Sequence, residues 1–191
     1  MPGTVRPVAD EREGLLAYLA QQRAVLRLTA YGLTDEQAKA APSVSELSVG
    51  GLIKHVSRVE RGWIDIVLQR QEPFDPGADW TENFRLRPDE SLAGVLGEYE
   101  VTATETAAVI SDIADLGQGV PVPHDTPWFP ADVVEWSVRW VLLHLIEETA
   151  RHAGHADVVR ESIDGATAFS LMAAAEDWPA SPWITPWALA S

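Results

Sequence analysis

Apolar side chains recur at helical spacing in four long segments, which are separated by breaks rich in proline and glycine. The first segment covers about residues 10–31 and precedes Gly32, a residue typical of a helix C-cap. Thr34 with Gln37 three residues later predicts a short helix next. The second segment covers about residues 48–69, and its apolar stripe consists of Leu52, Val56, Val59, Trp63 and Ile66.

The third and fourth segments complete the helical pattern. The third begins near residue 89 or 91 and ends before Gly117. The fourth begins near Ala131 and continues to Gly165, where Asp164 and Gly165 form a terminating turn. Its middle, WSVRWVLLHLIEETARH, is apolar nearly all round, so we expect it to be the most buried helix. Together the four segments predict a single all-α domain over residues 1–191.

Three stretches break the pattern. Residues 71–88 are polar and contain three prolines, which predicts a long surface connection of the kind that carries crossovers or binding loops. The stretch VPVPHDTPWFP is too rich in proline to be helical. The tail, residues 176–191, has three tryptophans spaced by prolines. It either covers the bundle as an irregular segment, or it lines a pocket or docks on a partner subunit.

Composition narrows the function classes. The formal net charge of −15 disfavours both nucleic acid and anionic membranes as partners. No apolar run approaches the ~18 residues of a membrane span, and the first 14 residues are polar, so we expect a cytoplasmic protein without membrane contact. The chain has no cysteine, which excludes disulfides, thiolate ligands and a cysteine nucleophile. Any sulfur chemistry must therefore use a thiol from outside.

Five residues form a candidate metal site. His144, Glu148, His152 and His155 are spaced by 4, 4 and 3 residues, which places them on one face of the fourth helix. Burying one carboxylate and three imidazoles without a shared purpose would be costly. His55 lies on the inward stripe of the second helix, and packing the two helices together would bring it towards Glu148 and His152.

Two imidazoles and one carboxylate are a common ligand set for catalytic zinc, which keeps one position open. We therefore expect His55, Glu148 and His152 to bind a divalent metal; zinc is the default, and nickel, iron or manganese also fit. His144 and His155 would orient the ligands or act as acid–base groups. The alternative is a hydrogen-bonded core histidine on one helix and an ordinary i, i+4 salt bridge on the other.

Two arginines flank this face of the fourth helix. Arg139 and Arg151 are candidates for binding an anionic group of a substrate. The alternative is that they are surface or ion-paired residues, as most such arginines are. The metalloprotease signatures, a phosphate loop and a dinucleotide-binding motif are all missing from the sequence.

The segments SVGGLIKHVSRVERGWID and RWVLLHLIEETARHAGHADVVRESIDG resemble the metal-binding helices of the DinB-like (YfiT-like) superfamily. They are most similar to its mycothiol-dependent branch, which includes maleylpyruvate isomerase and mycothiol S-transferase-like proteins. The resemblance covers roughly residues 10–165. It implies a four-helix bundle with long crossover connections and a metal held by His55, Glu148 and His152. Relatives of the bacillithiol branch generally have histidine where this chain has Glu148, so the glutamate favours the mycothiol branch.

The resemblance implies a metal-dependent thiol S-transferase that joins a mycothiol-type low-molecular-weight thiol to an electrophile, a detoxification reaction. A bound metal stabilises the thiolate of such a cosubstrate. Two alternatives use the same residues: a metal-dependent hydrolase, in which the ion activates water, and a non-catalytic metal- or ligand-binding bundle. The facial triad of iron oxygenases also has this ligand set. Bundles of this kind often pair, and the sequence leaves the oligomeric state open between a monomer and a homodimer.

Overall fold

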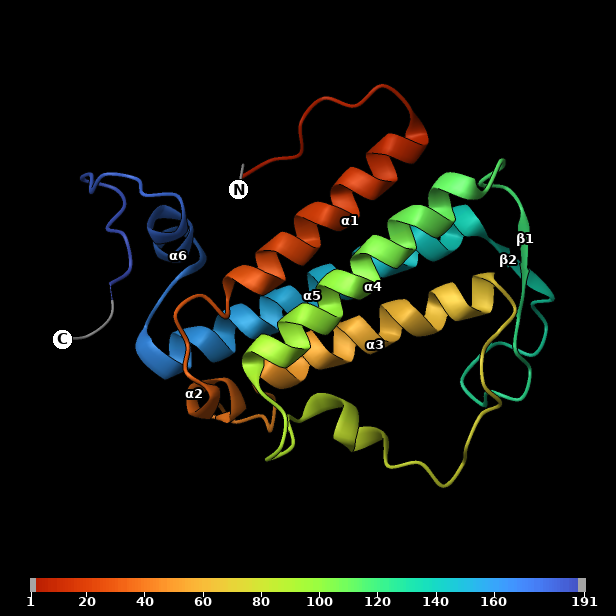
Figure 1. The fold of residues 1–191 in the computed structure, drawn as a ribbon, viewed down its shortest axis with the longest axis horizontal. Coiled ribbons are helices and arrows are strands. Elements are labelled where there is room, and N and C mark those ends of the chain that lie inside the picture. The colour runs from red at the N-terminus through yellow and green to blue at the C-terminus, as the bar shows by residue number, and fades with distance from the viewer. Residues whose placement is uncertain (1–2, 189–191) are drawn as a thin grey trace.

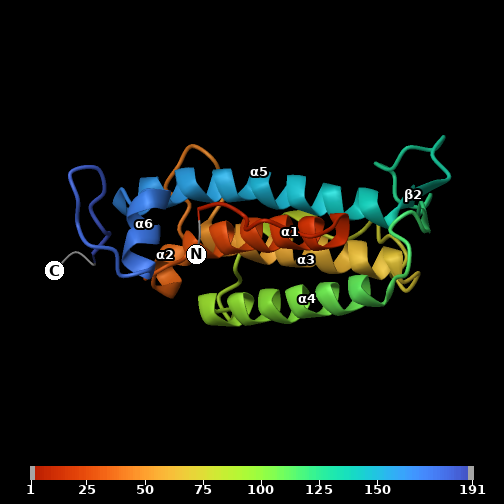
Figure 2. The same cartoon turned by 90° about the horizontal axis from the view of Figure 1, so that it is seen from above.

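The computed structural model describes residues 3–188 and forms a four-helix bundle (Figures 1 and 2). The bundle helices are α1 (Glu11–Leu28), α3 (Val49–Val67), α4 (Leu92–Asp112) and α5 (Val138–Asp164). The smaller elements are α2 (Asp35–Lys39), the 3-10 helix η1 (Trp80–Phe84), the strands β1 (Gly119–Pro121) and β2 (Glu135–Ser137), and α6 (Ala168–Ala175). The predicted all-α fold and its four main helices are thus confirmed.

A side-chain N-cap starts each bundle helix, where its oxygen accepts a hydrogen bond from a free backbone N–H of the first turn. These caps are Asp10, Ser48, Ser91 and Ser137. The first three lie close to the starts that the sequence predicts. The predicted start of the fourth helix near Ala131 is wrong. Residues 135–137 instead pair with residues 119–121 as an antiparallel ribbon, and the helix begins only after Ser137.

The chain direction explains the long connection. In Figure 1, α1 and α5 run one way along the bundle, and α3 and α4 run the other way. Since α3 and α4 are consecutive and parallel, the chain must return along the whole bundle between them. Residues 68–91 make this return, with η1 in the middle, and we call this segment the crossover. The polar stretch that the sequence predicts as a surface connection is therefore the crossover of the bundle.

The helices pack unequally around the bundle. The helix α1 lies against α5 along most of its length, and α3 contacts both α4 and α5. By contrast, α1 and α4 barely touch. A buried ion pair crosses the interior, where the Arg23 guanidinium donates to both carboxylate oxygens of Glu60, at 2.9 and 2.5 Å. The Thr106 hydroxyl donates to the same carboxylate at 2.5 Å, so the buried charge is fully paired.

The end of the bundle opposite the β1–β2 ribbon is covered by α6 and the residues that follow it. Gly32 and Gly165 both take the left-handed conformation that ends a helix or its following turn. The helix α6 then lies across this end, and the segment after it brings Trp187 back over Arg160 and Tyr31. The predicted Trp- and Pro-rich tail thus packs on the bundle as far as residue 188, and residues 189–191 lie outside the described range.

Of the helices formed by residues 3–188, none combines the length and the apolar character that crossing a bilayer requires. The apolar core is instead divided into two clusters along the bundle. One cluster lies towards α2 and the start of α3, and the other lies towards the β1–β2 ribbon. The candidate metal ligands are on α3 and α5, whose direct packing brings residues 93 positions apart into contact.

Candidate metal centre

The packing of α3 on α5 brings three of the predicted ligands together. His55 projects from α3, and Glu148 and His152 project from successive turns of α5. The Glu148 Oε1 atom lies 3.3 Å from His55 Nε2 and 3.1 Å from His152 Nε2. One ligand atom from each residue lies within 4.8 Å of the other two. Among the described residues, this is the one such group of histidines and carboxylates.

The charge state of this group suits a cation. The pKa of Glu148 is held far below its ordinary value, because the His152 and His55 side chains hydrogen-bond to its carboxylate and outweigh the opposing effect of burial. The carboxylate is therefore ionised at neutral pH. All three side chains are only partly exposed, so they are shielded from bulk water yet reachable from it. Two imidazoles and an ionised carboxylate in this setting fit a divalent metal ion.

Both imidazole rings present the same nitrogen to the centre. Nε2 of His55 and of His152 faces Glu148, whereas the two Nδ1 atoms are buried without a hydrogen-bond partner among the described residues. Metal-binding histidines are usually oriented by a hydrogen bond to that second nitrogen. Here ring packing orients them instead, since the two imidazoles meet edge to face at 4.7 Å.

Phe84 is the residue that the sequence analysis missed. Its ring stacks on His55 with the centroids 3.8 Å apart and the planes at 21°. It is the last residue of η1, so the crossover covers the side of α3 that carries His55. Gly51 makes this approach feasible, because a Cβ there would overlap the carbonyl oxygen of Phe84. The sequence does carry a signal for this contact, because the Gly50–Gly51 pair allows another segment to lie close to α3. That segment, residues 84–86, is remote in the chain, so the sequence does not identify it.

Comparison with known families identifies the family of this chain. The family model for mycothiol S-transferase matches residues 14–165, which include all four bundle helices except the first three residues of α1. The chain belongs to the mycothiol S-transferase family. The matched range also contains His55, Glu148 and His152.

A solved structure supports the fold of this mycothiol S-transferase family member. The crystal structure of a conserved protein from Enterococcus faecalis superposes on it with a TM-score of 0.63. The superposition covers 83% of this chain and 100% of that chain at 16% sequence identity, so it bears on the fold alone. A search of curated proteins gave no match.

The other two histidines of the α5 face lie on either side of the three ligands in this family member. His155 is exposed, and its ring is 5.5 Å from that of His152. His144 is stacked on Trp140 at 5.3 Å and meets Trp63 edge to face at 4.8 Å. Its Nδ1 atom lies 3.5 Å from the exposed Glu147 carboxylate. His155 is thus next to the candidate ligand His152, whereas His144 is part of an aromatic stack one turn from Glu148.

The two predicted anion-binding arginines differ in their surroundings. The Arg139 guanidinium donates two hydrogen bonds to Glu11 on α1, at 2.6 and 3.0 Å, so its charge is already paired. Arg151 is exposed and forms no hydrogen bond or ion pair within residues 3–188. It precedes His152 directly on α5. Of the two, Arg151 is the one free to meet an anionic group near the ligands.

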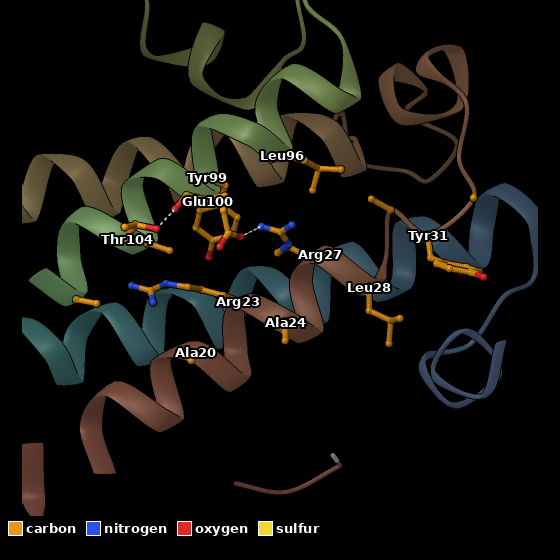
Figure 3. Close-up of a pocket in the computed structure, with 14 residues that line it drawn as sticks. Ala20, Arg23, Ala24, Arg27, Leu28, Tyr31, Leu96, Tyr99, Glu100 and Thr104 are labelled. Atoms are coloured by element: carbon orange, nitrogen blue, oxygen red, sulfur yellow. Dashed lines mark hydrogen bonds and ion pairs between the residues drawn. The ribbon is translucent and has the colours of Figure 1, made fainter. Parts of the chain in front are cut away.

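A pocket of about 960 Å³ lies elsewhere, between α1 and α4, where these helices barely touch (Figure 3). The close-up shows small side chains such as Ala20 and Ala24 along its wall, and the Arg27–Glu100 ion pair across it. None of the three metal-ligand candidates lines this pocket. It is therefore a separate feature, and the candidate centre lies in the α3–α5 interface under the crossover.

Proposed function

We propose that this protein is a metal-dependent thiol S-transferase, which joins a mycothiol-type low-molecular-weight thiol to an electrophile in a detoxification reaction. The observation that carries the proposal is the convergence of His55, Glu148 and His152 in a member of the mycothiol S-transferase family. The chain has no cysteine, so the reacting sulfur comes from the cosubstrate. Zinc is the metal we expect, given two imidazoles and one carboxylate.

The proposed roles follow from the surroundings of each residue. A divalent metal bound by the three ligands supplies a Lewis acid that stabilises a thiolate at neutral pH. Glu148 contributes a full negative charge, because its lowered pKa keeps it ionised. His155 is exposed beside His152 and is suited to pass the thiol proton to solvent. Arg151 is suited to attract an anionic group of a substrate, while His144 helps to shape the approach to the centre.

The first test is metal content. We expect about one zinc per wild-type chain by elemental mass spectrometry. His55→Ala and His152→Ala should each lose it while keeping the helical circular dichroism spectrum. His124→Ala is the matched control, because His124 is an exposed histidine in the β1–β2 loop outside the three ligands. Equal metal content in all four proteins would refute the ligand assignment.

The second test is the reaction itself. Zinc-loaded protein should accelerate formation of the thioether between mycothiol and an electrophile such as 1-chloro-2,4-dinitrobenzene, as followed by mass spectrometry of the conjugate. The His55→Ala variant should fall to the uncatalysed rate. A metal-loaded protein that hydrolyses ester substrates but forms no conjugate would favour the hydrolase instead. The cytoplasmic location expected from the sequence stays a prediction, and the choice between a monomer and a homodimer stays open.

A further inference from the structure

Large aromatic side chains gather beside the candidate metal centre. They come from the crossover, from the loop between β1 and β2, from β2 itself, and from the facing ends of α3 and α5. Neighbouring rings have centroids between 4.8 and 6.2 Å apart, so the contacts form one continuous network. We call this network the aromatic cluster; it consists of Trp63, Phe74, Trp80, Trp128, Phe129, Trp136 and Trp140.

Three indoles of the aromatic cluster face solvent. Trp80 is 46% exposed, Trp128 is 59% exposed and Trp140 is 39% exposed. Single exposed apolar residues are common on proteins, whereas a contiguous exposed aromatic surface marks a binding site. Trp63 is buried beneath it and supports Trp136 and Trp140 from α3. The aromatic cluster is therefore a supported surface with open ring faces or edges.

The aromatic cluster is continuous with the candidate metal centre on two sides. On α5, Trp140 stacks on His144 with the planes at 10°, and Glu148 follows one turn later. On the crossover, Trp80 begins η1, and Phe84 at its end stacks on His55. Figure 1 shows the first part of the crossover and the β1–β2 loop at the same end of the bundle as the start of α5.

The crossover and the β1–β2 loop, which carry the exposed Trp80 and Trp128, are joined to each other. The Phe74 backbone N–H donates to the Asp125 carboxylate at 3.0 Å, which ties the crossover to the β1–β2 loop. Phe74 also stacks on Trp80 at 5.7 Å and meets Trp128 edge to face at 5.2 Å. Trp80 and Trp128 are thus held in fixed relative positions, and Trp140 is held separately by Trp63 and Trp136, as a preformed ligand surface requires.

We infer that the aromatic cluster binds the electrophilic cosubstrate, and that this electrophile is a planar, uncharged aromatic molecule. The inference rests on the proposed thiol transfer, because it assigns the second substrate of that reaction. Indole rings stack on flat π systems and make no comparable contact with small aliphatic molecules. Arg151, the arginine proposed to attract an anionic group, lies outside the aromatic cluster, and the net charge of −15 disfavours an anionic ligand at the cluster itself. Binding here places the electrophile beside the metal ligands, where the thiol reacts.

The covalent step is a substitution without redox change. With 1-chloro-2,4-dinitrobenzene as the probe, the thiol sulfur forms a bond to the ring carbon that carries chlorine. The carbon–chlorine bond breaks, chloride leaves with the bonding electrons, and the thiol proton passes to solvent. The aromatic cluster takes no part in bond making; it holds the flat ring close to the thiolate and so determines which electrophiles react.

Binding can be tested without turnover. The unreactive planar analogue 2,4-dinitroaniline should quench the tryptophan fluorescence of wild-type protein saturably. Trp128→Ala and Trp140→Ala should each raise its dissociation constant roughly 3- to 10-fold, as the loss of one aromatic contact predicts; Trp140 is stacked between Trp136 and His144, so its contact with the ligand is edge to face. Trp183→Ala is the matched control, because Trp183 is 91% exposed in the tail and lies outside the aromatic cluster. Circular dichroism checks that each variant folds, and unchanged affinity in both cluster variants would overturn the inference.

Kinetics separate this inference from the proposed function. Each zinc-loaded protein is assayed with mycothiol and either 1-chloro-2,4-dinitrobenzene or the small aliphatic electrophile iodoacetamide. The ratio of kcat/KM for the aromatic to the aliphatic electrophile should fall roughly 3- to 10-fold in Trp140→Ala and Trp128→Ala, but not in Trp183→Ala. An unchanged ratio would overturn the inference. Turnover of neither electrophile, with dinitroaniline binding as expected, would overturn the proposed function and support the aromatic site.

A second copy of the chain is the competing occupant. If Trp128→Ala dissociates a dimer in sedimentation experiments while the affinity for dinitroaniline stays at the wild-type value, the aromatic cluster is a contact between copies, and the inference is overturned. If the sedimentation of wild type and Trp128→Ala is the same and the affinity falls, the small-molecule site is supported.

Discussion

Arg160 is fully buried, yet every side of its guanidinium has a partner. It donates to the backbone carbonyls of Thr29 and Tyr31, both at 2.7 Å, and to the carboxylate of Asp164 at 3.0 and 2.9 Å. Burial raises the pKa of Asp164, but hydrogen bonds from Arg160 and from the Ala166 backbone lower it more, so it stays ionised. One side chain therefore joins α5 to the turn after α1.

Removing this charge should cost much of the stability. Arg160→Met leaves two backbone carbonyls and one carboxylate without their donor, so we expect a loss of about 3–5 kcal/mol in the free energy of unfolding. Urea unfolding followed by circular dichroism measures it. Arg151→Met on the same helix is the control, because Arg151 is exposed and has no ion pair in the described range; it should change stability by less than about 0.5 kcal/mol. Equal losses of stability in Arg160→Met and Arg151→Met would contradict the stabilising role assigned to the buried Arg160 guanidinium.

At the scale of elements, the crossover depends on the first turn of α3. Gly50 and Gly51 lie under residues 84–86, and a Cβ on either would overlap atoms of that segment. For Gly51 the overlap is with backbone, which has no rotamer to move away. The two glycines let the crossover lie directly on α3, and that contact sets the position of Phe84 on His55.

A methyl group at this contact should separate the two segments. Gly51→Ala should cost about 1–3 kcal/mol of stability, as overpacking does elsewhere, and should weaken zinc binding because Phe84 no longer supports His55. Gly62→Ala is the control on the same helix, where nothing lies within 4 Å of the added atom. There the higher helix propensity of alanine should add about 0.5–1 kcal/mol. Thermal unfolding and zinc titration measure both effects, and a stabilised Gly51→Ala would show that the crossover does not rest on this turn.

The sequence predicts elements well where caps and periodicity coincide. Ser48, Ser91 and the Thr34–Gln37 capping box mark real helix starts. The helix α6 has no such signal, because the residue that returns the hydrogen bond to Thr167 is Ser170, which is neither glutamate nor glutamine. The three-residue strands are also too short for periodicity to reveal, and their pairing displaces the start of α5.

The residues of the candidate site also differ in how far the sequence predicts their positions. Glu148 and His152 share a helix, so their spacing alone indicates that they lie together. His55 is found through its position on an inward stripe, once two helices are packed face to face. Phe84 lies in a polar connection and reaches His55 through the crossover, which no local pattern encodes. Local chemistry is thus readable from the sequence, whereas contacts made by an irregular segment depend on the assembled fold.

At the scale of the whole molecule, the two ends of the bundle are organised differently. The β1–β2 ribbon and the first part of the crossover form one end, where the exposed Trp128 lies in the β1–β2 loop and Trp140 lies at the start of α5. The turn after α1, α6 and the tail form the other end (Figure 1). Between them, α3 and α5 carry the metal-ligand candidates. This separation implies that a change at the tail alters stability without reaching the metal ligands.

Trp187 is the tail residue that joins this end together. Its ring lies 4.9 Å from the Arg160 guanidinium carbon and meets Tyr31 edge to face at 5.9 Å. Its backbone N–H donates to the Ser170 carbonyl of α6 at 2.9 Å. The ring also covers Gly32, where an added Cβ would come within 2.5 Å of it. The tail therefore packs on α5 and on the turn after α1 through this indole, and it is bonded to α6 through the backbone of the same residue.

Trp187→Ala should consequently destabilise the bundle and leave the metal site intact. We expect a loss of about 1–3 kcal/mol in the free energy of unfolding, less than for a fully buried tryptophan, because this ring is only partly buried and contributes a cation–π contact as well. Trp183→Ala, four residues earlier in the tail, should stay within about 0.5 kcal/mol of wild type. Zinc content should be the same in wild type and both variants. If Trp187→Ala instead lost zinc at a temperature where it is folded, the tail would be coupled to the metal centre, and the two ends of the bundle would not act independently.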